Sequence, residues 1–60
     1  MKTKQITRPI LGVMYSFAGR YPTKESARER AQILNNVDKH AYYTRITESG
    51  SHYWDVRTQN

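Results

Sequence analysis

Apolar residues alternate with smaller or more polar ones along residues 10–18, "ILGVMYSFA". This period of about two residues is typical of a half-buried β-strand. The side expected to face the core carries Leu11, Val13, Tyr15 and Phe17. The next residues, "GRYPT", include Gly19 and Pro22, and we expect them to end the strand.

The pattern then changes to the period of about 3.6 residues that is typical of a helix. In "TKESARERAQILNN", the residues Ala27, Ala31 and Leu34 form one apolar stripe. Thr23 is a suitable N-cap, although a capping box that starts at Ser26 would begin the helix one turn later. The sequence therefore predicts a helix that packs its alanine stripe closely against a sheet.

The segment "HAYYTRITESGSHYWDV" predicts two strands joined by a turn at Gly50. Its aromatic residues occur at both odd and even positions, so the pattern alone does not say which side is buried. A three-residue loop, Glu48 to Gly50, would place Arg45 opposite Tyr53, whereas a two-residue loop would place Arg45 opposite Trp54. We expect the three-residue loop, because it separates apolar from polar side chains better.

With that register, the two faces of the hairpin differ in character. The face expected to be buried carries Tyr42, Thr44, Ile46, His52, Trp54 and Val56. The face expected to be exposed carries Tyr43, Arg45, Thr47, Tyr53, Asp55 and Arg57.

The element order predicts an α+β fold, a small β-α-β-β domain with one helix on one face of a three-stranded sheet. We expect an antiparallel sheet of order 1-3-2, because "YWDV" is the most apolar part of the hairpin and suits the centre. The alternative order 1-2-3 would make the first two strands parallel neighbours. The expected core consists of Leu11, Val13, Tyr15, Phe17, Ala27, Ala31, Leu34, Tyr42, Ile46, Trp54 and Val56.

Charge divides the 60-residue chain into two parts. Of the net charge of +5, residues 1–9 supply +3 through Lys2, Lys4 and Arg8, with no acidic residue. We interpret residues 1–9 as a flexible basic arm and residues 10–60 as a single, mildly basic domain. The absence of cysteine favours a reducing compartment, so we expect a cytoplasmic protein, and no apolar run is long enough for a membrane span.

The sequence contains no pattern typical of an enzyme. It has no cysteine nucleophile, no suitably spaced pair of carboxylates and no phosphate-binding loop. His40 and His52 fall at opposite ends of their predicted strands, so they would not meet at a metal. We therefore expect no catalytic residue, no cofactor and no metal site.

The face left uncovered by the single helix is the candidate binding surface. Its expected residues are Met14, Tyr43, Arg45, Tyr53, Asp55 and Arg57. Exposed aromatic and arginine side chains are enriched at the centres of protein interfaces, so we expect a protein partner, bound at this face or at an edge strand. The alternative is single-stranded DNA or RNA, with bases stacked on the tyrosines and phosphates near the arginines and the basic arm. A homodimer formed by strand pairing is a third hypothesis.

The residues "LGVMYSF" and "TKESARERAQIL" resemble the first strand and helix of peptidoglycan-binding sporulation-related repeats. Those repeats continue into a second helix and a fourth strand, which this chain lacks, so no site is carried over. The whole layout is also similar to that of many small bacteriophage proteins, which implies a partner in host machinery that the protein inhibits or modulates. This second similarity covers the whole chain and depends on no specific motif.

Overall fold

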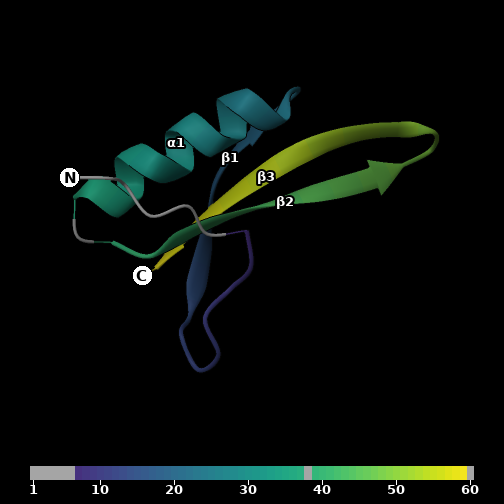
Figure 1. Cartoon of the computed structure of the whole chain (residues 1–60). Helices are drawn as coiled ribbons and strands as arrows, with labels where there is room; N and C mark the ends of the chain where they lie inside the picture. The colour runs from purple at the N-terminus through teal and green to yellow at the C-terminus, as the bar shows by residue number, and fades with distance from the viewer. Residues whose placement is uncertain (1–6, 38, 60) are drawn as a thin grey trace.

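The computed structural model describes residues 7–37 and 39–59, which form three strands and one helix (Figure 1). In chain order these are β1 (Tyr15–Tyr21), α1 (Lys24–Asn36), β2 (Ala41–Glu48) and β3 (Ser51–Gln59). The strands form one sheet of order β1-β3-β2, and both pairs are antiparallel. The predicted α+β class, the β-α-β-β order and the 1-3-2 sheet are therefore confirmed.

Helix α1 begins and ends where its local sequence predicts. The hydroxyl oxygen of Thr23 caps the helix by accepting a hydrogen bond of 3.2 Å from the Ser26 backbone N–H, so the start one turn later is not used. At the other end, the side chain of Asn35 joins the helix to β2. Its amide donates to the carbonyl oxygens of Ala31 (2.9 Å) and Ala41 (3.1 Å), and its oxygen accepts from the Ala41 N–H (3.2 Å).

Strand β1 lies five residues later than its predicted start. Residues 10–13 form a turn instead, in which the Val13 N–H donates to the Ile10 carbonyl at 3.1 Å and Gly12 has a φ of 87°. Pairing with β3 reaches only Tyr15, which lies opposite Gln59 near the end of β3. No described residue before Tyr15 pairs with a strand, and Leu11 is fully exposed rather than buried in the core.

A β-bulge in β1 reverses which side chains face the helix. The register with β3 shifts between Phe17 and Gly19, so β1 contains one additional residue, Ala18, that lies opposite no residue of β3. Gly19 was expected to end the strand, but it lies within it. A Cβ atom at Gly19 would lie 3.0 Å from the ring of Tyr21, so the close approach of this ring favours glycine.

The hairpin has a two-residue loop, so the predicted three-residue register is wrong. Ser49 (φ 51°) and Gly50 (φ 80°) both lie in the left-handed region, as in a type I′ turn, whose twist matches that of the adjoining strands. Arg45 therefore lies opposite Trp54, and Tyr43 lies opposite Val56. The expected orientation is correct for β3 and inverted for β2.

The core lies between α1 and the β2–β3 half of the sheet. Ala27 and Ala31 of the helix, with Ala41, Tyr43 and Val56 of the sheet, are its buried apolar residues, and Ala18, Tyr21, Leu34 and Trp54 pack around them. Of the expected core, the residues Ala27, Ala31, Leu34, Trp54 and Val56 are confirmed. Tyr15, Phe17, Tyr42 and Ile46 instead belong to the opposite face of the sheet, because of the bulge and the shorter loop.

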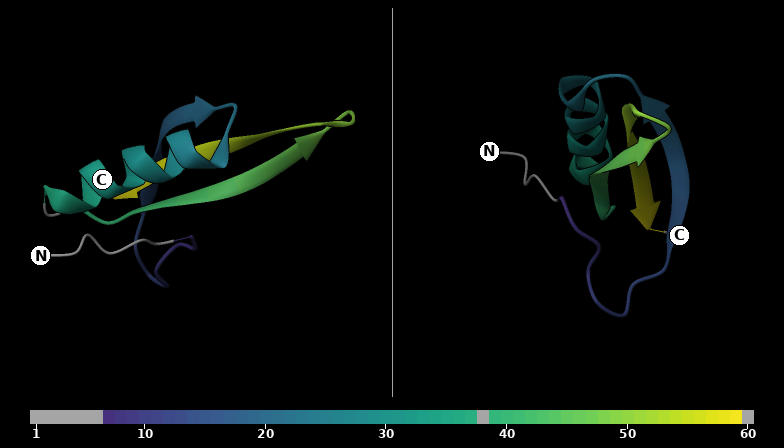
Figure 2. Two further views of the ribbon diagram at one scale, coloured as in Figure 1. Left: turned by 45° about the horizontal axis from the view of Figure 1, so that its top comes forward. Right: turned by 90° about the vertical axis from the view of Figure 1, so that its right-hand side faces the viewer.

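Helix α1 covers one face of the sheet and leaves the tip of the hairpin beyond its end (Figure 2). No described helix or strand covers the opposite face. Within the described part of the chain, no helix is long and apolar enough to cross a membrane.

Candidate functional site

The sheet face that points away from α1 is the candidate functional site. Cross-strand partners in an antiparallel sheet share a face, so the register defines its members. They are Tyr15, Phe17 and Arg20 of β1, Tyr42, Thr44, Ile46 and Glu48 of β2, and Ser51, Tyr53, Asp55, Arg57 and Gln59 of β3. We call this set the uncovered face. Four of its members are aromatic and two are arginines.

An ion pair at the centre of the uncovered face joins β1 to β3. Arg20 Nε donates to Asp55 Oδ1 at 2.9 Å, and Arg20 Nη2 donates to Asp55 Oδ2 at 3.4 Å. The Asp55 residue is only 3% exposed, whereas the side chain of Arg20 is 54% exposed. The hydrogen bond that Arg20 donates to Asp55 raises the pKa of Arg20 above its usual value. The guanidinium therefore covers the carboxylate and separates it from solvent.

Aromatic rings and guanidinium groups alternate across this face. The Arg20 Cζ atom lies 4.0 Å from the ring centre of Tyr53, which is a close stacking distance. Phe17 lies near both cations, with the Cζ atoms of Arg20 and Arg57 at 5.9 and 5.8 Å from its ring centre. Phe17 is also 53% exposed, so much of its surface remains in contact with solvent.

The end of the uncovered face is fixed by a pair of tyrosines. The rings of Tyr15 and Tyr42 meet edge to face, with their centres 4.9 Å apart. The Tyr15 hydroxyl accepts a hydrogen bond of 2.9 Å from the Ile10 N–H, which holds the preceding turn against β1. This turn presents apolar side chains to solvent, since Leu11 is 100% and Met14 is 76% exposed.

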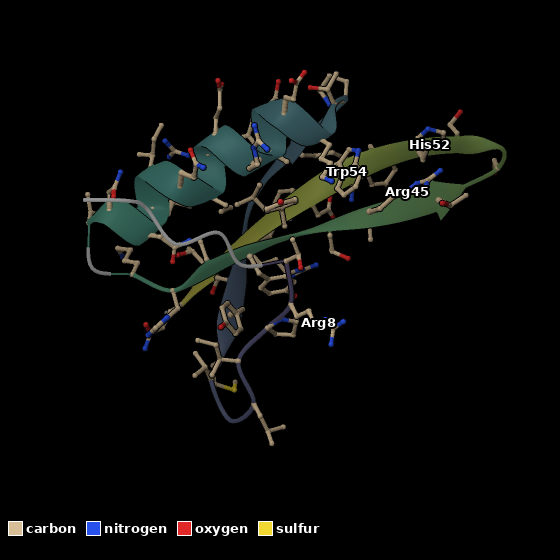
Figure 3. All side chains as sticks on the ribbon, viewed as in Figure 1. Arg8, Arg45, His52 and Trp54 are labelled. Carbon is tan, nitrogen blue, oxygen red and sulfur yellow. The ribbon has the colours of Figure 1, made fainter. Side chains whose placement is uncertain are left out.

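Three of the predicted surface residues, Tyr53, Asp55 and Arg57, lie together on the uncovered face. Tyr43 does not, because the two-residue loop turns it into the core, where it is 3% exposed. Arg45 shares the helix-facing side with Trp54 but lies toward the hairpin tip, where it is exposed (Figure 3). Met14 precedes β1 and is outside the sheet.

The predicted basic arm is described only in part. Arg8 is exposed and lies in the segment that leads into β1 (Figure 3). Lys2 and Lys4 lie outside the described residues.

Phe17, Arg20 and Tyr42 are members of the uncovered face that the sequence pattern assigned elsewhere or left unassigned. Phe17 and Arg20 are three positions apart, so regular alternation places them on opposite faces. The bulge at Ala18 brings them onto the same face. Gly19, inside an otherwise strand-like segment, was the one signal in the sequence for such a bulge.

The described residues contain no cluster of three or more histidine, cysteine or acidic side chains that could hold a metal. His40 precedes β2, while His52 pairs with Thr47 near the hairpin tip, so the two histidines lie toward opposite ends of the hairpin. Comparison with known protein families, curated proteins and solved structures found no match to this chain. The resemblance to sporulation-related repeats therefore gains no support.

Proposed function

We propose that this protein is a small non-catalytic module that binds single-stranded DNA or RNA on its uncovered face. The observation that carries the proposal is the half-exposed side chain of Phe17, whose ring centre has the guanidinium carbons of Arg20 and Arg57 at 5.9 and 5.8 Å. Exposed aromatic rings on a sheet provide stacking platforms for bases, and nearby cations attract the phosphates. An uncovered face that combines both features suits a flexible anionic chain.

The position of Asp55 favours nucleic acid over the protein partner that the sequence pattern suggested first. An exposed carboxylate in the middle of the face would repel phosphate. Asp55 is instead buried beneath Arg20, which balances its charge, so Arg57 is the cation that the middle of the face offers to phosphate. The exposed carboxylate of Glu48 lies at the hairpin end of this face, 3.5 Å from the Tyr53 hydroxyl. The acidic residues Glu25 and Glu29 belong to α1, which packs against the other side of the sheet.

The basic residues near the N-terminus would strengthen binding through attraction to phosphates, which does not depend on the base sequence. Lys2, Lys4 and Arg8 supply +3 of the net charge of +5, and attraction of this kind weakens as salt rises. Arg57 would add a contact on the sheet itself. We also propose that the protein is located in the cytoplasm, because this reducing compartment suits a chain without cysteine.

Salt-dependent binding of a fluorescent thymine oligonucleotide, followed by anisotropy, tests the proposal. Each phosphate contact with a single strand contributes about 0.7 to the slope of log affinity against log salt. We expect Arg57→Ala to weaken binding and to reduce this slope by about 0.7. Arg45→Ala is the matched control, because it removes the same charge from the helix-facing side of the sheet. Equal effects of the two substitutions, or no binding by the wild type at low salt, would contradict the proposal.

A protein partner is the second candidate, favoured by the exposed apolar turn before β1. Ile10, Leu11 and Met14 are 37%, 100% and 76% exposed. Exposed aliphatic side chains of this kind are typical of protein interfaces rather than of contacts with nucleic acid. This candidate includes the inhibitor of host machinery that the bacteriophage-like layout suggested. Affinity capture from the native cell with and without nuclease separates the two candidates, because only a direct protein partner survives nuclease and is lost with Leu11→Ser. A homodimer would instead appear as twice the monomer mass in solution.

A further inference from the structure

The guanidinium group of Arg20 is held in place from two sides. Asp55 accepts hydrogen bonds from Nε and Nη2, and the ring of Tyr53 lies 4.0 Å from Cζ. Since Asp55 is buried in the central strand β3, its position fixes that of Arg20. An arginine held in this way has lost much of its side-chain freedom before any ligand arrives.

The contact with Asp55 leaves one edge of the guanidinium open. A guanidinium carries five N–H donors, and the side-on contact with Asp55 uses the Nε edge. The end formed by Nη1 and Nη2 still carries two parallel N–H bonds. Within the described part of the chain, Asp55 is the only residue that accepts a hydrogen bond from the side chain of Arg20, and this side chain is 54% exposed. This end can therefore donate to a ligand with two adjacent acceptors.

A neutral pair of acceptors suits this end better than a phosphate does. The charge of Arg20 is already balanced by Asp55, which reduces the attraction that an anion would feel. A neutral ligand needs only the geometry of the two donors. Guanine offers such a pair in O6 and N7, which is the commonest partner of a bidentate arginine in DNA recognition, whereas adenine places an amino donor beside its N7.

Phe17 provides a place for such a base beside Arg20. The Arg20 Cζ atom is 5.9 Å from the centre of the Phe17 ring, so the edge of a base stacked on Phe17 lies within reach of the guanidinium. We propose that Arg20 reads the O6 and N7 edge of guanine, and that the uncovered face therefore prefers single strands that contain guanine. This inference depends on the proposed function, because it assigns a base preference to the same surface.

The test compares thymine oligonucleotides of about twelve nucleotides, a length that spans a typical single-strand site. One contains guanines at regular intervals, the second contains 7-deazaguanine at the same positions, and the third contains adenine there. All three have the same length and charge. We expect wild-type protein to bind the guanine strand about tenfold more tightly than the adenine strand. The 7-deazaguanine strand, which lacks only N7, should lose most of this preference.

Two substitutions locate the preference. Arg20→Lys keeps the positive charge but cannot donate two parallel hydrogen bonds, so it should bind all three strands with similar affinity and an unchanged salt slope. Arg57→Lys is the matched control and should retain the preference. Circular dichroism checks that both variants are folded, and the 7-deazaguanine comparison on wild-type protein requires no variant.

The possible outcomes separate the two proposals. Binding of all three strands with equal affinity by wild-type protein would overturn the role of Arg20 and leave the proposed function intact. The absence of binding to any strand at low salt would overturn both. A guanine preference that survives Arg20→Lys would assign the reading to another residue and would also overturn the inference.

Discussion

Replacement of Tyr43 by alanine should destabilise the protein far more than replacement of Phe17. Tyr43 is 3% exposed, lies among the buried residues under α1 and has its ring centre 6.1 Å from that of Trp54. Truncation of a buried aromatic residue to alanine typically costs about 3–5 kcal/mol. A domain of 60 residues has a total stability of roughly 3–9 kcal/mol, so Tyr43→Ala should leave little of it.

Phe17→Ala removes a ring that is 53% exposed on the uncovered face. With about half of its surface buried, the expected loss is about 1 kcal/mol. The same substitution should weaken binding of a thymine oligonucleotide, since base stacking on an aromatic ring contributes about 1–3 kcal/mol per base. We therefore predict that Phe17 contributes little to folding and much to binding, and that Tyr43 has the opposite role.

Urea unfolding followed by fluorescence measures this difference, with Trp54 as the single tryptophan. For a small domain, the free energy of unfolding falls by about 1 kcal/mol per molar urea, so Phe17→Ala should lower the midpoint by about 1 M. Tyr43→Ala should lower it by several times as much, or leave no folded baseline. Equal losses from the two substitutions, or a larger loss from Phe17→Ala, would refute the assignment of the two sheet faces.

Two further predictions concern the connections that set the register. In the type I′ turn, Gly50→Ala should lower stability by about 1 kcal/mol because alanine tolerates the positive φ poorly, while Ser49→Asn should raise it slightly, both measured by thermal unfolding. Asn35→Ala removes three side-chain hydrogen bonds, one to Ala31 within α1 and two to Ala41 of β2, and should cost about 1–3 kcal/mol in urea unfolding. A loss well below about 1 kcal/mol for Asn35→Ala would contradict the role assigned to this side chain.

The helix could be predicted closely from the sequence because its signals are local. The Thr23 cap and the stripe of Ala27 and Ala31 all lie within the helix or beside it. The sheet order could also be predicted, since "YWDV" combines the apolar residues that a central strand needs.

The faces of the sheet could be predicted only in part, because they depend on distant pairing. Tyr42 and Tyr43 are equally suited to burial. Ile46 is more apolar than Arg45, which favours burial of the even-numbered residues of β2. That comparison does not decide the register, because Arg45 lies beyond the end of α1, where the helix does not cover it (Figure 3). The backbone of Ser49 and Gly50 sets the register instead, with positive φ at both residues.

The candidate site, like the sheet faces, could be predicted only in part. Tyr53, Asp55 and Arg57 could be placed on one face because the orientation of β3 was correct. Arg20 and Phe17 could not be placed together, since the bulge that unites them depends on pairing between β1 and β3.

An NMR titration with a thymine oligonucleotide, which maps the chemical-shift changes of the backbone amides, tests the central claim most directly. We predict that the largest changes occur at residues of the uncovered face, above all Phe17, Arg20 and Arg57. The exposed side of α1, which carries Glu25 and Glu29, should change little. Shifts centred on the helix, or no shifts at a low salt concentration, would contradict the claim that the uncovered face binds single-stranded nucleic acid.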